Sequence, residues 1–130
     1  MKEISYEELN KMLNSKNPND INLDDDDIKT ILKNKDLFFI DVCEYKDDNE
    51  LKSVMQSTHK LEFKNMKSSI LICFHIHPNY NIIKITNIMD TFNMTYNDAE
   101  FIIFCTSTNE KISENGIKAT IIMTFSKKLY

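Results

Sequence analysis

The sequence predicts an α+β fold, a two-layer sandwich in which helices cover one face of a mixed four-stranded sheet, preceded by N-terminal helices. Segments with apolar residues at helical spacing alternate along the chain with short apolar runs of strand length. The last two apolar runs, Phe101–Phe104 and Ile117–Phe125, flank a polar turn, and the second alternates apolar with polar residues. This pattern is typical of a β-hairpin that buries one face.

Two helices are predicted at the N-terminus. Ser5–Ser15 begins with a capping box formed by Ser5 and Glu8, and its apolar residues recur at helical intervals. Pro18 ends this segment, because a proline disfavours helical backbone in the residue before it. Asp24–Lys33 is predicted as a second helix with an acidic first turn, which interacts favourably with the helix dipole.

The remaining segments complete the sandwich. Strands are expected at Leu37–Val42 and Ser69–Ile76, and helices at Asp47–Ser57 and Asn81–Phe92, ahead of the terminal hairpin. Alternating strands and helices with a final hairpin favour a ferredoxin-like arrangement with right-handed crossovers. We divide the chain into an N-terminal helical segment, 1–33, and an α+β domain, 34–130.

Composition limits the classes of function. The 130 residues carry a net charge of −4 and include no arginine, so nucleic-acid binding is disfavoured. No apolar run approaches the roughly 20 residues that span a bilayer, and the first residues lack the apolar core of a signal peptide. A cytoplasmic protein without membrane contacts is the expectation.

Three segments resemble the C-terminal domain of FtsZ, the bacterial tubulin-like GTPase of cell division. INLDDDDIKTIL (21–32) is similar to the segment that ends the family's GTPase domain, and LICFHIHPNYNIIKI (71–85) is similar to a strand, turn and helix of the C-terminal domain. AEFIIFCTSTNEKISENGIKATIIMTF (99–125) is similar to the closing pair of strands. The resemblance covers roughly residues 21–126 and implies a bacterial, FtsZ-like C-terminal domain.

The resemblance does not extend to a nucleotide site. The family holds GTP with a glycine-rich loop in an N-terminal domain, where backbone amides approach the phosphates. This chain contains one glycine, Gly116, which lies in the closing segment instead. We therefore expect a free-standing C-terminal domain that binds no nucleotide cofactor and is not an enzyme.

The acidic run before the second helix is the main candidate for an interaction site. In the family, an asparagine and two aspartates form a loop that enters the nucleotide site of the next subunit, and these positions correspond to Asn22, Asp24 and Asp27. Two family packing residues between them are replaced by Asp25 and Asp26. A solvated acidic helix start is the alternative, and a Ca²⁺ loop lacks the required ligand spacing. GTP hydrolysis completed in trans is a further reading of the same residues.

Cys73, His75 and His77 alternate along a predicted strand, so their side chains share one face and are weak candidates for metal ligands. Residues two apart on a strand are separated by about 6.5 Å, which favours a structural histidine pair and no metal site. Cys43 and Cys105 also lie in apolar runs and are expected to be buried thiols.

The function predicted from these features is a non-enzymatic protein-interaction module that binds FtsZ or a tubulin-like protein and modulates its filaments. The alternative is a self-associating structural protein, or one that binds a small ligand, outside cell division, because a fold does not fix a function. A homo-oligomer is compatible with both.

Overall fold

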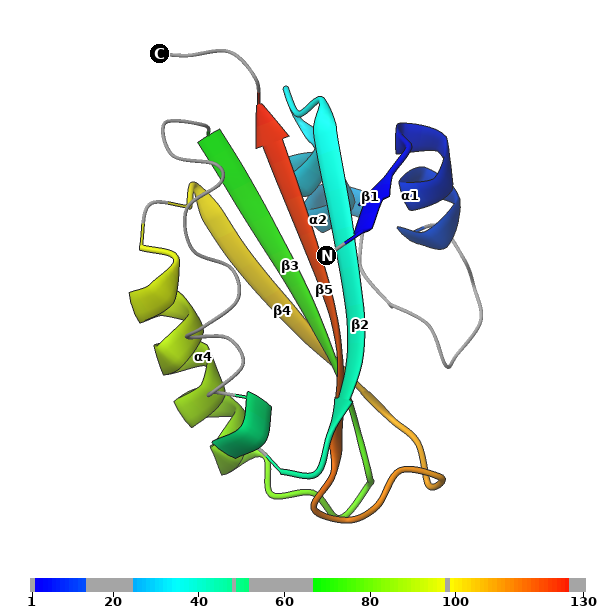
Figure 1. Ribbon diagram of the computed structural model, residues 1–130, viewed down its shortest axis with the longest axis vertical. Helices are drawn as coiled ribbons and strands as arrows, with labels where there is room; N and C mark the ends of the chain where they lie inside the picture. Colours follow the sequence, from blue (N-terminus) through cyan, green and yellow to red (C-terminus); the bar gives the residue numbers. More distant parts are fainter. Residues whose placement is uncertain (1, 14–24, 48, 52–66, 98, 127–130) are drawn as a thin grey trace.

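The computed structural model describes residues 2–13, 25–47, 49–51, 67–97 and 99–126. Within these ranges the chain forms five strands in one sheet, with helices on both sides of it (Figure 1). The elements, in chain order, are β1 (Lys2–Ile4), α1 (Tyr6–Leu13), α2 (Asp25–Leu32), β2 (Leu37–Tyr45), β3 (Lys67–Ile76), α4 (Ile83–Thr95), β4 (Phe101–Thr108) and β5 (Ile117–Ser126). The predicted α+β fold class is confirmed, but the described sheet has five strands where four were predicted, and α1 and α2 cover the face that the two-layer prediction left open.

The sheet has the strand order β1-β2-β5-β3-β4. β5 pairs antiparallel with both β2 and β3, whereas β3 and β4 run parallel. The parallel pair is joined through α4, the crossover helix that such a connection requires. The strands predicted near Leu37, Ser69, Phe101 and Ile117 are therefore all present, and β1 is added at one edge.

The predicted terminal hairpin is wrong, because β3 lies between β4 and β5. The connection from 109 to 116 is long enough to pass over one strand, since crossing two strand spacings requires only about 10 Å. β3 carries apolar residues on both of its faces and is buried almost throughout. Placing β3 between two strands satisfies its backbone groups on both sides, which a β4–β5 hairpin would not do.

Two apolar clusters lie on opposite faces of the sheet. The larger packs Ile85, Ile88 and Phe92 of α4 against even-numbered residues of β3, together with Leu51 from a short helical stretch, 49–51. The smaller packs α1 and α2 against the other face; its members are Leu9, Leu13, Ile28, Ile31, Phe38, Leu71, Cys73 and Ile122. Figure 1 shows α4 on one side of the sheet and α1 and α2 on the other.

β5 is buried on both faces, not on one as its alternating sequence predicts. The polar positions of the alternation lie on the face that α1 and α2 cover, where the Thr120 hydroxyl lies 3.3 Å from His75 Nε2 of β3 and Thr124 bonds to α2. The Thr124 hydroxyl donates to the Ile31 carbonyl at 2.9 Å, which joins the end of α2 to the middle of the sheet. Alternation alone therefore failed to distinguish a solvated face from a covered face that contains threonines.

The helix predicted at 81–92 is α4, displaced by two or three residues toward the C-terminus. Of the helix predicted at 47–57, residues 49–51 are helical and residues 52–57 lie outside the described ranges. β1 has only three residues and two of them are charged, so it gives no periodic signal in the sequence. None of the helices described in the structure is long and apolar enough to cross a bilayer.

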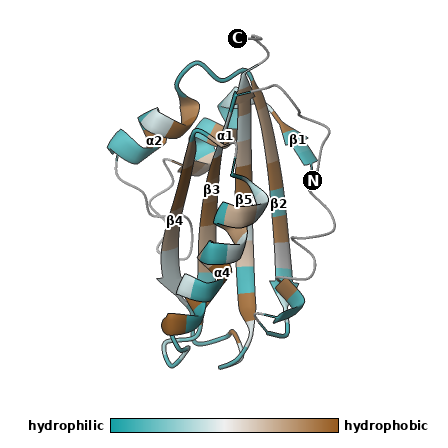
Figure 2. Ribbon diagram, turned by 90° about the vertical axis from the view of Figure 1, so that its left-hand side faces the viewer, coloured by the Kyte–Doolittle hydropathy of each residue, from teal (hydrophilic) through white to brown (hydrophobic). Residues whose placement is uncertain are grey.

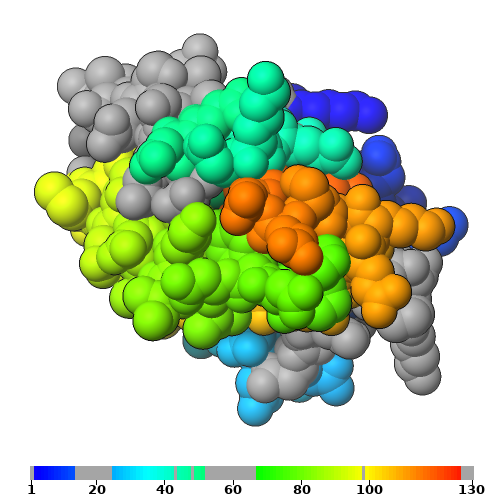
Figure 3. Space-filling view, turned by 90° about the horizontal axis from the view of Figure 1, so that it is seen from below, coloured from blue at the N-terminus to red at the C-terminus, as the bar shows by residue number. Residues whose placement is uncertain are grey.

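The loop from 109 to 116, which joins β4 to β5, lies at the lower end of the sheet in Figure 1. Figure 3 shows this orange segment beside the ends of β2 and β3. The Asn79 amide donates to the Glu114 carboxylate at 3.5 Å. At Gly116, a Cβ atom would lie 2.4 Å from the Ser113 hydroxyl oxygen, so the only glycine allows the turn to close without a clash.

Candidate functional site

The acidic residues singled out by the sequence lie at the start of α2. Asn22 and Asp24 fall outside the described residues, while Asp25, Asp26 and Asp27 form the first turn of the helix. Asp25 and Asp26 are exposed and Asp27 is half-buried. Three carboxylates at this end interact favourably with the helix dipole, and the first two are accessible to a partner.

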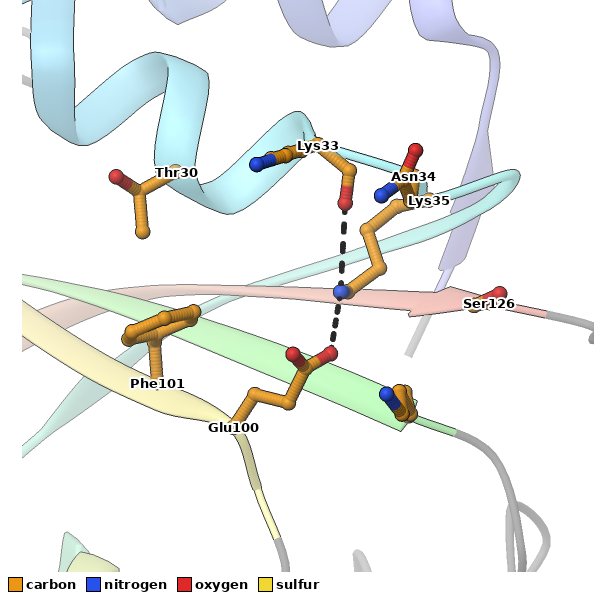
Figure 4. Close-up of a pocket in the computed structure, with 8 residues that line it drawn as sticks. Thr30, Lys33, Asn34, Lys35, Glu100, Phe101 and Ser126 are labelled. Atoms are coloured by element: carbon orange, nitrogen blue, oxygen red, sulfur yellow. Dashed lines mark hydrogen bonds and ion pairs between the residues drawn. The ribbon is translucent and has the colours of Figure 1, made fainter. Parts of the chain in front are cut away.

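A cavity of about 330 Å³ lies near the opposite end of α2. It is bounded by the turn after α2 and by the adjacent ends of β3, β4 and β5, as Figure 4 shows. Its lining residues are Thr30, Lys33, Asn34, Lys35, Lys67, Glu100, Phe101 and Ser126. Three lysines against one glutamate leave this cavity electropositive, in a chain whose net charge is −4.

An ion pair closes one side of this cavity. The Lys35 ammonium donates to Glu100 Oε1 at 2.8 Å and to the Lys33 carbonyl at 3.5 Å (Figure 4). The Lys35 side chain is only 4% exposed, whereas that of Glu100 is 35% exposed. The hydrogen bond from Lys35 holds the pKa of the Glu100 carboxyl below its usual range, with additional help from the charge of Lys67.

Replacing Glu100 with glutamine is expected to destabilise the fold by up to about 1 kcal/mol at pH 7, because the Lys35 ammonium would lose its charged partner at a site where Glu100 is partly exposed to solvent. Because the pKa of Glu100 is lowered in the folded state, the ion pair stabilises the fold fully at pH values above the usual pKa of glutamate. This stabilisation is lost as the pH falls through the lowered pKa of the folded state. Urea unfolding at pH 7 and pH 3 should therefore show a difference between native protein and variant that shrinks at the lower pH. A constant difference would contradict the assignment.

The candidate metal ligands do not converge. Cys73 and His75 lie on the same face of β3, and His77 follows the strand. His75 is 7% exposed, and its ring nitrogens lie 2.7 Å from the Ser107 hydroxyl and 3.3 Å from the Thr120 hydroxyl. His77 Nδ1 accepts a hydrogen bond from the backbone N–H of Asn79 at 3.1 Å.

These contacts give both histidines structural roles. In the part of the chain that the structure describes, no three His, Cys, Asp or Glu side chains gather closely enough to hold a metal ion. Cys73 is buried, whereas Cys105, which was also expected to be buried, is half-buried on the edge strand β4. The side chain of Cys43 is not among those described.

No pattern in the sequence predicts the lysine-lined cavity. Lys35 and Glu100 are 65 residues apart in sequence, and Lys67 belongs to a third segment. None of these residues stands in a motif or a charge run, so only the sheet order brings them together. The hydroxyl partners of His75 were missed for the same reason.

Comparison with known proteins shows the fold. No family model matches the chain, and no curated protein matches it. Two FtsZ structures from M. jannaschii, an empty dimer and a W319Y mutant, each superpose with a TM-score of 0.60 at 20% and 19% identity. CetZ1 from Haloferax volcanii, a GDP-bound monomer, gives a TM-score of 0.54 at 11% identity.

These alignments cover 78–80% of this chain but only 31–33% of the other proteins, so the chain spans about a third of their length. The chain has an FtsZ C-terminal-domain-like fold.

Proposed function

We propose that this chain is a non-enzymatic interaction module that binds FtsZ or a related tubulin-like protein and modulates its filaments in the cytoplasm. The observation that carries the proposal is the size of the structural match. Four-fifths of the chain superposes on FtsZ, and the alignment involves only about a third of the FtsZ polypeptide. A protein that offers one part of a filament subunit can occupy a subunit contact without extending the filament.

The start of α2 is the surface we assign to this contact. The sequence resemblance matches Asn22, Asp24 and Asp27 to the family loop that enters the neighbouring subunit. Asp27 lies in the first turn of α2, next to the exposed Asp25 and Asp26. α2 is held on the sheet by Ile28 and Ile31, which fixes the position of its first turn relative to the sheet.

Co-sedimentation with FtsZ from the same cell tests the proposal directly. We expect the chain to appear in the polymer pellet, or to lower polymer mass at substoichiometric concentration, as a capping protein would. Absence of the chain from the pellet, together with polymer mass and GTP turnover that stay unchanged at saturating protein, would reject the proposed function.

A double substitution of Asp24 and Asp27 by asparagine is expected to weaken binding to FtsZ at least about tenfold, which corresponds to 1.4 kcal/mol. Asparagine also caps helices well, so the fold itself should lose little stability. The matched control replaces Asp25 and Asp26 by asparagine, which removes the same charge from positions that do not match the family loop. Equal weakening by both variants would indicate a general charge effect and contradict the loop assignment.

A further inference from the structure

The two edges of the sheet differ in how they are protected against further strand pairing. β1 forms one edge with three residues, of which Lys2 and Glu3 are charged. Among the strands that the structure describes, β4 forms the other edge, and its eight residues, FIIFCTST, include no charge and no proline. Natural sheets usually protect long edges with lysine, proline or a bulge, because an open edge presents hydrogen-bonding groups to another strand.

The side chains of β4 are more exposed than its apolar sequence predicts. Phe101 is 48% exposed and Phe104 is 49% exposed. Phe101 lies at the cavity beside α2, whereas Phe104 packs edge-on against Phe74 on the face that α4 covers. Figure 2 shows β4 at the margin of the sheet, with hydrophobic colouring along most of its length. Each face of the sheet therefore has one partly exposed phenyl ring at this edge.

We propose that β4 is a dimerisation edge, where a second copy of this chain adds its own β4 antiparallel to form a continuous ten-stranded sheet. A partner strand is favoured over a flat apolar ligand because an edge offers backbone N–H and C=O groups as well as side chains. A second copy is favoured over a charged peptide because β4 is uncharged. Two copies therefore pair without repulsion and leave no unpaired charge at the interface.

Symmetry fixes the arrangement further. A closed dimer with antiparallel β4 strands has its two-fold axis perpendicular to the sheet, so like faces of the two copies continue into one another. Residues directly opposite each other then share a face. The Phe104 ring would lie beside Ile102, Phe104 or Thr106 of the second copy, according to register, and Phe101 would be covered in the same way on the other face.

The oligomeric state of the full chain tests this proposal. An edge-to-edge contact is small, so we expect a dimer in the micromolar range, the usual strength of interfaces below about 1,200 Å². Sedimentation equilibrium up to about 500 μM covers that range. Hydrogen exchange on the same samples should show β4 amides that become protected as concentration rises.

Thr106→Lys is expected to weaken the dimer at least tenfold, because Thr106 is exposed on the edge strand and each copy would contribute a charge to the interface. Phe104→Lys should weaken it further. Asn93→Lys is the control, since it adds the same charge at an exposed position of α4. Circular dichroism and thermal unfolding of each variant at low concentration separate loss of pairing from loss of fold.

Several results would overturn the proposal. These are a monomer throughout the concentration range, a dimer that Thr106→Lys and Asn93→Lys weaken equally, and a dimer without concentration-dependent protection of β4. A monomer that captures an extended peptide on β4 would also overturn it, because the occupant would be another protein. The test uses the chain alone, so its failure is distinguishable from failure to bind FtsZ.

Discussion

Replacing Phe74 with alanine is expected to destabilise the fold by about 3–5 kcal/mol, the range measured for truncation of buried phenylalanines. Phe74 lies in the middle of β3 with no exposed surface, and its ring packs edge-on against Phe92 of α4 at 6.5 Å between centroids. Phe104 of β4 contacts the same ring at 6.3 Å. One truncation would therefore loosen the central strand, the crossover helix and the edge strand together.

Chemical denaturation of the native chain and the variant measures this loss. Met94→Ala is the control, because Met94 is 80% exposed on the same helix that Phe74 contacts, and its truncation should change the free energy of unfolding by less than about 0.5 kcal/mol. A cost below 1 kcal/mol for Phe74→Ala would show that the cluster beneath α4 does not hold the sheet together.

Local patterns predicted the elements of this fold better than their arrangement. The stripe from Ile85 to Phe92 has a clear helical period and the apolar run from Ile70 to Ile76 has the length of a strand, and both form the expected element. Strand pairing is decided by non-local contacts, so adjacent strands with a good turn between them, β4 and β5, were paired incorrectly. The sequence contains no local signal that β3 inserts between them.

The candidate sites show the same contrast between features that are contiguous in sequence, which were predictable, and features that depend on the arrangement of the strands, which were not. The acidic turn of α2 is contiguous in sequence and therefore predictable, whereas of the alternating residues Cys73, His75 and His77 only the first two lie on β3. The cavity of Lys33, Lys35 and Glu100 depends on which strand ends meet, so no spacing rule predicts it. The exposure of Phe104 was also unpredictable, because an edge strand and a central strand have similar apolar sequences.

The helices before residue 33 were separated from the domain on the basis of sequence, and that division stays a prediction that a deletion can test. Leu9, Leu13 and Ile31 are almost fully buried, and they cover Leu71 and Ile122 on the second face of the sheet. Thr124 also loses its hydrogen bond to Ile31 if α2 is removed. A fragment comprising 34–130 would therefore expose the whole second apolar cluster to water.

We expect this fragment to fail to unfold cooperatively, with a heat-denaturation transition that is broad or absent by calorimetry. Ile31→Ala in the full chain is a milder test of the same contact. It should lower the free energy of unfolding by about 2–5 kcal/mol, because it leaves a cavity between α2 and the sheet. Lys29→Ala is the control, since Lys29 is exposed on the same helix. A cooperative transition in the fragment, together with a small loss for Ile31→Ala, would establish 34–130 as an independent domain. The opposite result makes α2 part of the folding unit, so the acidic turn that we assign to partner binding would be held on a rigid element, which favours a well-defined contact surface.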